Sequence, residues 1–292
     1  MAIDKLQEKI RKLKNPSMVD FSFDIAAIPP HIMEQEGSVL GAYERVCMEL
    51  MNALKAVVPA VRFSVGRFSL LGADGLRLLT KLTARAKEQD YYVLLDAPES
   101  YSPQGAQTAA AALFAESCPY VFDGLMLSVY AGSDALKPYV KQLKTSSKDV
   151  FVVLRTANKS AAELQDLLTG SRLVHMAAAD VVNRYAQELT GRSGYSQVAG
   201  VGPASVADIL KKLRARYKEL FLLVEGYDYS TANAKNCSFA FDKLGHGAVV
   251  CSGRGIVAAW DTDLYDGAEY LKPAVEAAER MKKNLLRYTT VL

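Results

Sequence analysis

Short apolar runs, rich in β-branched and aromatic residues, alternate with longer amphipathic segments along almost the whole chain, and this pattern limits the fold more than any other feature. The runs predict eight strands. They cover Met18–Asp24, Ala60–Val65, Tyr91–Asp96, Val121–Leu127, Val150–Leu154, Ser196–Val201, Leu220–Val224 and Ala248–Cys251. Eight β–α units close a (β/α)₈ barrel, and strands this apolar are typical of a parallel sheet covered by helices. The sequence therefore predicts an α/β protein with a TIM (β/α)₈ barrel.

The segments between the predicted strands carry helical patterns. The predicted helices cover Met1–Lys14, Gly37–Ala56, Gly72–Glu88, Gln104–Ser117, Ser133–Lys144, the stretch from about residue 155 to Leu189, and Glu269–Leu286. No linker or shift in composition interrupts the pattern, so we expect a single barrel domain over residues 1–292 with an N-terminal helix and a C-terminal helical extension. An open doubly wound sheet is the alternative. It would favour a glycine-rich turn after the first strand, where the chain reads Phe23-Asp24-Ile25-Ala26.

Composition argues against several classes of protein. The 35 lysines and arginines exceed the 32 acidic residues by only three, so we expect no nucleic-acid partner. No apolar run reaches the roughly 18 residues of a membrane span, and the charged N-terminus lacks the apolar core of a signal peptide, so we expect a cytoplasmic protein without a membrane partner. The four cysteines and three histidines are scattered, which predicts reduced thiols, no metal and no cofactor.

Polar residues at the carboxyl ends of the predicted strands are the candidates for a site, because chemistry in a barrel lies at that end. The most distinctive segment follows the eighth strand and reads Ser252-Gly253-Arg254-Gly255. Glycines let backbone N–H groups approach an anion, and a guanidinium can clamp a phosphate with two hydrogen bonds. A tight turn with a surface arginine explains the same residues equally well.

Several segments together carry a family resemblance. They are Val57-Val58-Pro59-Ala60-Val61, Tyr130-Ala131-Gly132-Ser133-Asp134, Phe151 to Asn158, Ser193-Gly194-Tyr195-Ser196 and Ser252-Gly253-Arg254-Gly255-Ile256. In order and spacing the chain resembles the longer bacterial class of orotidine 5′-phosphate decarboxylase. The resemblance implies a TIM barrel that forms a homodimer, with an N-terminal helix against the barrel bottom. It also implies a pyrimidine nucleotide ligand and no cofactor.

The resemblance also implies a set of substrate-binding residues. Asp24 matches an aspartate that contacts the ribose, Thr156 falls in the strand-five signature, and Arg254 matches the phosphate-binding arginine. The other expected members follow the ends of strands four, seven and eight: Ser128, Gly226, Ser252, Gly253 and Gly255.

The catalytic segment departs from the family pattern. The family uses a Lys/Asp/Lys/Asp network, with one lysine on strand two and a D-x-K-x-x-D motif after strand three. Here Arg62 takes the place of the first lysine, and the motif reads Asp96-Ala97-Pro98-Glu99-Ser100-Tyr101. Asp96 and Arg62 remain as the candidate catalytic residues. The motif lysine has become Pro98 and the last aspartate Tyr101, so it is uncertain whether the chain is an enzyme.

The departures from the family pattern concern two functions, the protonation of the carbon left by decarboxylation and the binding of the phosphate. Pro98 has no side-chain proton to give to the carbon left by decarboxylation, and a guanidinium with a pKa above about 12 is a poor acid. Ser230 replaces a glutamine that helps to hold phosphate, and the acids Glu225 and Asp228 are expected to weaken phosphate binding unless they point away or pair with Arg254.

Three hypotheses follow from the residues. The leading one is a family member that has lost decarboxylation and still binds a nucleotide or sugar phosphate. The second is an enzyme with different chemistry on a phosphorylated sugar, and the third is a non-catalytic scaffold or regulatory dimer partner. We also expect Arg62 and Asp96 to form an ion pair that fills the former reaction centre.

Overall fold

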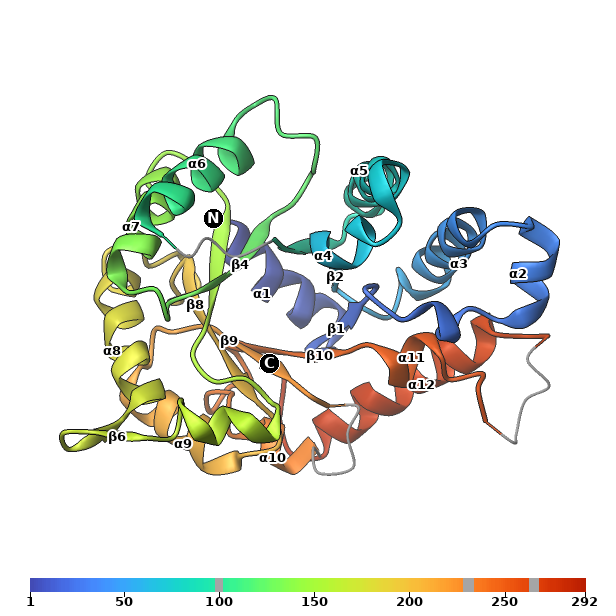
Figure 1. The fold of residues 1–292 in the computed structure, drawn as a ribbon. Helices are drawn as coiled ribbons and strands as arrows, with labels where there is room; N and C mark the ends of the chain where they lie inside the picture. Colours follow the sequence, from blue (N-terminus) through green and yellow to red (C-terminus); the bar gives the residue numbers. More distant parts are fainter. Residues whose placement is uncertain (98–101, 228–233, 263–267) are drawn as a thin grey trace.

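Eight parallel strands close into a barrel in a computed structural model that describes residues 1–97, 102–227, 234–262 and 268–292 (Figure 1). Around the barrel the strands follow the order β1-β10-β9-β8-β5-β4-β3-β2. They are β1 (Ser17–Asp20), β2 (Ala60–Ser64), β3 (Tyr92–Asp96), β4 (Gly124–Ser128), β5 (Asp149–Val153), β8 (Val198–Pro203), β9 (Leu222–Glu225) and β10 (Ala248–Ser252). The predicted (β/α)₈ barrel is therefore confirmed, and each of the eight predicted strand regions overlaps a barrel strand.

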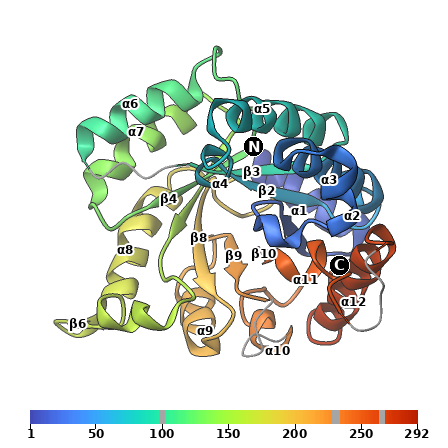
Figure 2. The ribbon, with the colours of Figure 1, turned by 45° about the vertical axis from the view of Figure 1, so that its right-hand side comes forward.

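Helices surround the barrel on its outer side (Figure 2). The longer ones are α1 (Ala2–Leu13), α3 (Val39–Leu54), α5 (Gly72–Glu88), α6 (Pro103–Phe114), α7 (Ser133–Leu143), α8 (Val174–Ala186), α9 (Ala207–Arg216) and α12 (Leu271–Leu286). The shorter ones are α2 (Pro30–Glu36), α4 (Val65–Ser69), α10 (Ala234–Ser238) and α11 (Arg254–Val257), with 3₁₀ helices η1 (Ile25–Ala27) and η2 (Lys159–Glu163). In the described parts of the chain, no helix has the length and apolar composition needed to cross a membrane.

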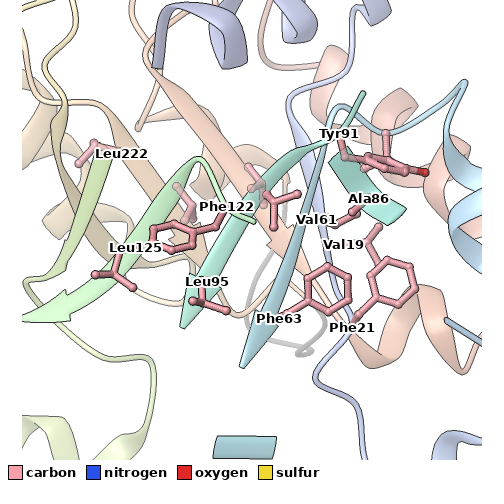
Figure 3. Close-up of a cluster of buried hydrophobic side chains, with 14 of the residues drawn as sticks. Val19, Phe21, Val61, Phe63, Ala86, Tyr91, Leu95, Phe122, Leu125 and Leu222 are labelled. Atoms are coloured by element: carbon pink, nitrogen blue, oxygen red, sulfur yellow. The ribbon is translucent and has the colours of Figure 1, made fainter. Parts of the chain in front are cut away.

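The period-two alternation of the strands divides the core into two parts. On β2 and β3, Val61, Phe63, Val93 and Leu95 belong to the cluster between the sheet and the helices. Figure 3 shows part of this cluster, in which the rings of Phe21 and Phe63 stack with centroids 5.6 Å apart. The alternate residues of the same strands point into the barrel, which decides where polar residues of each strand lie.

The inner cluster fills the barrel toward its N-terminal end. Tyr92, Phe151 and Phe221 lie there in successive edge-to-face contacts at 6.3 and 6.2 Å. Helix α1 contributes Ile3, Leu6 and Ile10 to the same cluster, along with Ala2 at its first turn. The amphipathic N-terminal helix thus closes the bottom of the barrel, as expected, because its apolar face covers the open end of the inner core.

Two predicted elements need correction. The first strand ends at Asp20 instead of Asp24, and the side chain of Asp24 accepts a hydrogen bond from Ala26 N at the start of η1. The helix expected from about residue 155 to Leu189 is interrupted by a two-stranded hairpin, β6 (Leu168–Thr169) and β7 (Arg172–Leu173). Gly170 adopts φ +63° in the hairpin turn, a conformation that an L side chain rarely accepts.

The buried carboxyl of Asp149, at the N-terminal end of the barrel, should make the free energy of unfolding depend on pH. Asp149 is fully buried and accepts a hydrogen bond from Tyr92 Oη at 2.8 Å, and burial raises its pKa well above the usual range. Because the folded pKa exceeds the unfolded value of about 3.9, the stabilisation that Asp149 provides is present below about pH 4 and lost as the pH rises through the folded pKa.

We therefore expect the free energy of unfolding of Asp149→Asn, relative to wild type, to improve as the pH rises from 4 to 8. Urea denaturation at both pH values measures this difference. The exposed Asp208→Asn serves as the control and should show no such trend. If the difference in the free energy of unfolding between Asp149→Asn and wild type does not change with pH, the raised pKa of Asp149 is contradicted.

Candidate functional site

Four charged side chains meet inside the carboxyl end of the barrel because of strand register. Asp20 and Arg62 are register partners on β1 and β2, and Asp96 on β3 lies level with Ser64, two residues beyond Arg62. Glu225 ends β9, one residue past Val224 of the outer core and two past Leu223 of the inner core. Period-two alternation places all four on the inner face, where no helix can cover them.

Arg62 is at the centre of this group. Its Nη2 atom lies 2.8 Å from Asp96 Oδ2, its Nη1 atom donates to Glu225 Oε1, and Asp20 Oδ2 lies 3.8 Å from Nη1. Only 15% of the Arg62 side chain is exposed. The predicted Arg62–Asp96 ion pair is confirmed, and the structure adds Glu225 and Asp20 to it. We call these four residues the ion cluster.

Electrostatics keep the guanidinium of Arg62 charged. Burial alone would lower its pKa, but the negative charges of Asp20, Glu225 and Asp96 outweigh that effect and raise the pKa well above the ordinary arginine value. A guanidinium in this state cannot release a proton near neutral pH. The Nε atom of Arg62 is buried without a hydrogen-bond partner among the described residues.

A cleft of about 740 Å³ opens above the ion cluster. This size is within the range of small-molecule sites, roughly 300–1,000 Å³. Of the substrate-binding residues expected from the sequence, the cleft is lined by Asp24, Gly226, Gly253, Arg254 and Gly255. Its described charged lining residues are Arg62, Arg254, Arg280, Asp20, Asp24, Glu225 and Asp261.

The charges at the rim of the cleft differ from those at its floor. Arg254 is 60% exposed and pairs with Asp261, with 2.7 Å between Nη2 and Oδ2. Asp24 faces Arg67 at 3.4 Å, and its pKa is lowered by the hydrogen bond from Ala26 N and by the positive charges of Arg67 and Arg254. The rim therefore carries exposed charges of both signs, in contrast to the mainly negative floor.

The structure decides between the alternatives for Glu225. The sequence predicted that this acid weakens phosphate binding unless it points away or pairs with Arg254. In the structure Glu225 is bonded to Arg62 at the floor, and Arg254 has Asp261 as its partner. The carboxylate of Glu225 therefore pairs with Arg62 in the ion cluster and not with Arg254.

Three expected binding residues, Thr156, Ser128 and Ser252, do not line the cleft. Thr156 donates from Oγ1 to Asn158 Oδ1 at 2.5 Å, and its backbone N–H donates to the Gln165 side chain. Ser128 Oγ accepts a hydrogen bond from Tyr130 N at 3.3 Å. Ser252 lines a smaller neighbouring hollow instead. The hydroxyl of Thr156 and the hydroxyl of Ser128 each form a hydrogen bond within the turn that follows its strand. A role of these two residues in binding stays a prediction.

Several positions named by the sequence lie outside the described residues: Pro98, Glu99, Ser100, Tyr101, Asp228, Tyr229 and Ser230. Three described residues at the cleft were missed. Asp20 was hidden inside a strand predicted too long, although it alternates with the apolar Val19 and Phe21. Asp261 and Arg280 carry no motif, and no sequence signal pointed to them.

The described residues contain no group of three or more histidine, cysteine, aspartate or glutamate side chains arranged to hold a metal ion. Fold and site together define a class: a closed (β/α)₈ barrel with an ionic floor and an arginine-bearing rim at the carboxyl ends of its strands. The rim position after the last strands is where such barrels commonly bind phosphate.

Comparison with known proteins narrows this class. No protein-family model matches the chain. Orotidine 5′-phosphate decarboxylase of Rhodopirellula baltica is 29% identical over 230 residues, covering 77% of this chain and 76% of the relative. The protein of the same name from Petrotoga mobilis is 27% identical over 281 residues, covering 94% and 96%. The structure of Leishmania donovani OMP decarboxylase has a TM-score of 0.75 at 22% identity over 98% of both chains.

The curated relatives support the orotidine 5′-phosphate decarboxylase family for this chain, and the solved structure shows the same fold. The resemblance inferred from the sequence motifs agrees with this result.

Removing the central cation of the ion cluster should destabilise the protein. Arg62→Met keeps an unbranched side chain but leaves three carboxylates without their shared partner, and we expect a loss of about 3–5 kcal/mol in the free energy of unfolding. Arg77→Met is the matched control, because it removes an exposed ion pair with Asp74 and should cost less than about 1 kcal/mol.

Urea denaturation at pH 7 measures both variants. Adding Asp96→Asn and Glu225→Gln to Arg62→Met should recover part of the loss, because those changes remove the uncompensated charges. Equal free energies of unfolding for Arg62→Met and Arg77→Met would show that the ion cluster stabilises the protein no more than an exposed ion pair does.

Proposed function

We propose that this chain is a member of the orotidine 5′-phosphate decarboxylase family that binds a phosphorylated ligand, with a nucleotide as the leading candidate, and does not decarboxylate orotidine 5′-phosphate at a useful rate. The observation that carries the proposal is the ion cluster, in which the only cation at the cleft floor among the described residues is already shared by three carboxylates.

Loss of the proton donor supports the absence of decarboxylation. Decarboxylation leaves an electron pair on a ring carbon that must be protonated, and the family resemblance assigns this step to the lysine whose position is Pro98 here. Proline has no side-chain proton, and Arg62 holds its protons more tightly than a free arginine. Loss of a general acid typically costs about 10²–10⁴-fold in rate.

The charge at the floor also disfavours the substrate of the family reaction. Arg62 offers one positive charge, while Asp20, Asp96 and Glu225 offer three negative ones. A carboxylate placed about 4 Å from one of them, at an effective dielectric near 20, meets a repulsion of about 4 kcal/mol. A neutral base that donates hydrogen bonds meets no such penalty at the same place.

The rim supports binding of a phosphate. Arg254 is the first residue of α11, directly after β10, and Gly226, which adopts φ +86°, follows the neighbouring strand β9; both line the cleft. Glycine at this position leaves the loop backbone open to an approaching group, since no side chain covers it. The ligand is therefore expected to place its phosphate at the rim and its other end over the ion cluster.

The first test is the family reaction itself. We expect turnover of orotidine 5′-phosphate at least about 10⁴-fold below that of the Petrotoga mobilis relative, because proton donor and network charges are both missing. The loss of ultraviolet absorbance of the orotate ring follows the reaction, with the relative as the positive control. Turnover within a few hundred-fold of the control would overturn the proposal.

The second test compares two nucleotides that differ by one carboxylate. Uridine 5′-monophosphate should bind at least about tenfold more tightly than orotidine 5′-monophosphate, since only the latter brings a negative charge to the floor. Isothermal titration calorimetry measures both dissociation constants. Tighter binding of orotidine 5′-monophosphate would contradict the assigned polarity of the cleft.

A further inference from the structure

A second, smaller hollow of about 220 Å³ adjoins the cleft on the side of α12. Gly255 and Arg280 line both, so the two spaces meet at these residues. The hollow is smaller than the roughly 300–1,000 Å³ of a complete ligand site. Its size suits one chemical group at the end of a ligand whose body lies in the cleft.

Helix α12 presents two polar side chains to this hollow. Arg280 and Asn284 are four residues apart and so lie on the same face of the helix, and both line the hollow. Ala277 and Met281 of the same helix are buried and also line the hollow, and α12 packs against α3, α10, α11 and β1. The polar pair is thus carried by a helix that is fixed on the barrel.

Arg280 differs from the other two arginines of the cleft. Arg62 is held by the ion cluster, and Arg254 is paired with Asp261. Arg280 makes no ion pair or hydrogen bond with any described residue, although it lines both spaces. Its guanidinium therefore keeps all its donors and its charge available for a ligand.

We propose that Arg280 and Asn284 form an anion subsite on α12 that binds the phosphate-bearing end of the ligand, with Arg254 on the opposite side of the same group. This inference rests on the proposed function and adds the residues that recognise the anionic end. The ligand class is a phosphate ester or diphosphate long enough to reach from the ion cluster to α12. A planar guanidinium can clamp two phosphate oxygens, and the Asn284 amide can donate a further hydrogen bond.

The subsite also accounts for the charge balance at the rim. Asp261 neutralises Arg254 and lies in the same cleft, so one arginine alone would offer a dianion little net attraction. Arg280 supplies the additional positive charge from an element outside the strand ends. A phosphate between the two guanidinium groups would compete with Asp261 for Arg254.

The test uses the full chain and two probes, inorganic pyrophosphate and uridine 5′-monophosphate, in calorimetric titrations at low ionic strength. Arg280→Ala should weaken the binding of both probes at least about tenfold, and Arg280→Lys should recover only part of the loss because it keeps the charge without the planar fork. Lys283→Ala is the matched control: it removes an exposed positive charge from the same helix at a position outside both spaces, and it should change binding less than about twofold.

The outcomes separate the two proposals. Equal effects of Arg280→Ala and Lys283→Ala on pyrophosphate, or no binding of pyrophosphate to the wild type, would overturn the subsite. Pyrophosphate binding that depends on Arg280, without any binding of the nucleotide, would support the subsite and refute a nucleotide as ligand. Arg280 is exposed, so an unchanged melting temperature of Arg280→Ala would confirm that folding is intact.

Discussion

The interaction on which this site depends is the sharing of one buried guanidinium by carboxylates from three other strands. Arg62 comes from β2, and Asp20, Asp96 and Glu225 come from β1, β3 and β9. A buried charge is costly unless groups of opposite charge lie close to it. The attraction between Arg62 and the three carboxylates therefore favours the arrangement in which the four strand ends lie close together. The same compensation leaves the guanidinium without capacity for proton transfer, and this is the physical basis of the proposal that this end of the barrel binds a ligand.

The inside of the barrel is apolar toward its N-terminal end and charged toward its carboxyl end. Toward the N-terminal end, aromatic rings and the apolar face of α1 fill the space between the strands. Toward the carboxyl end, the inward positions of the same strands are charged, and the cleft above them ends in exposed arginines. The change occurs within two to four residues along a strand, because every second side chain points inward. A ligand entering the cleft therefore meets the Arg254–Asp261 and Arg67–Asp24 pairs and Arg280 at the rim, and mainly negative charge at the floor.

The sequence allowed the fold and part of the site to be predicted. The alternation of strand and helix patterns predicted the barrel, and the family resemblance, which places Arg62 and Asp96 at the former reaction centre, predicted their pairing. Asp20 was missed because the apolar pattern of the first strand continues through Phe21 and Phe23, which are buried although the strand has ended. The hairpin at β6 and β7 was missed because its strands of two residues are too short to show a period.

The sequence by itself determined the closed barrel, its apolar lower core and the kinds of charged residue at the strand ends, since these depend on local periodicity. Only the tertiary structure decided which charges meet. Glu225 pairs with Arg62 across 163 positions, and Arg254 takes Asp261 as partner while Arg280 reaches the same cleft from α12. Such pairings depend on which side chains come within reach once the barrel has closed and on where the last helix packs, and the spacing of residues along the chain predicts neither.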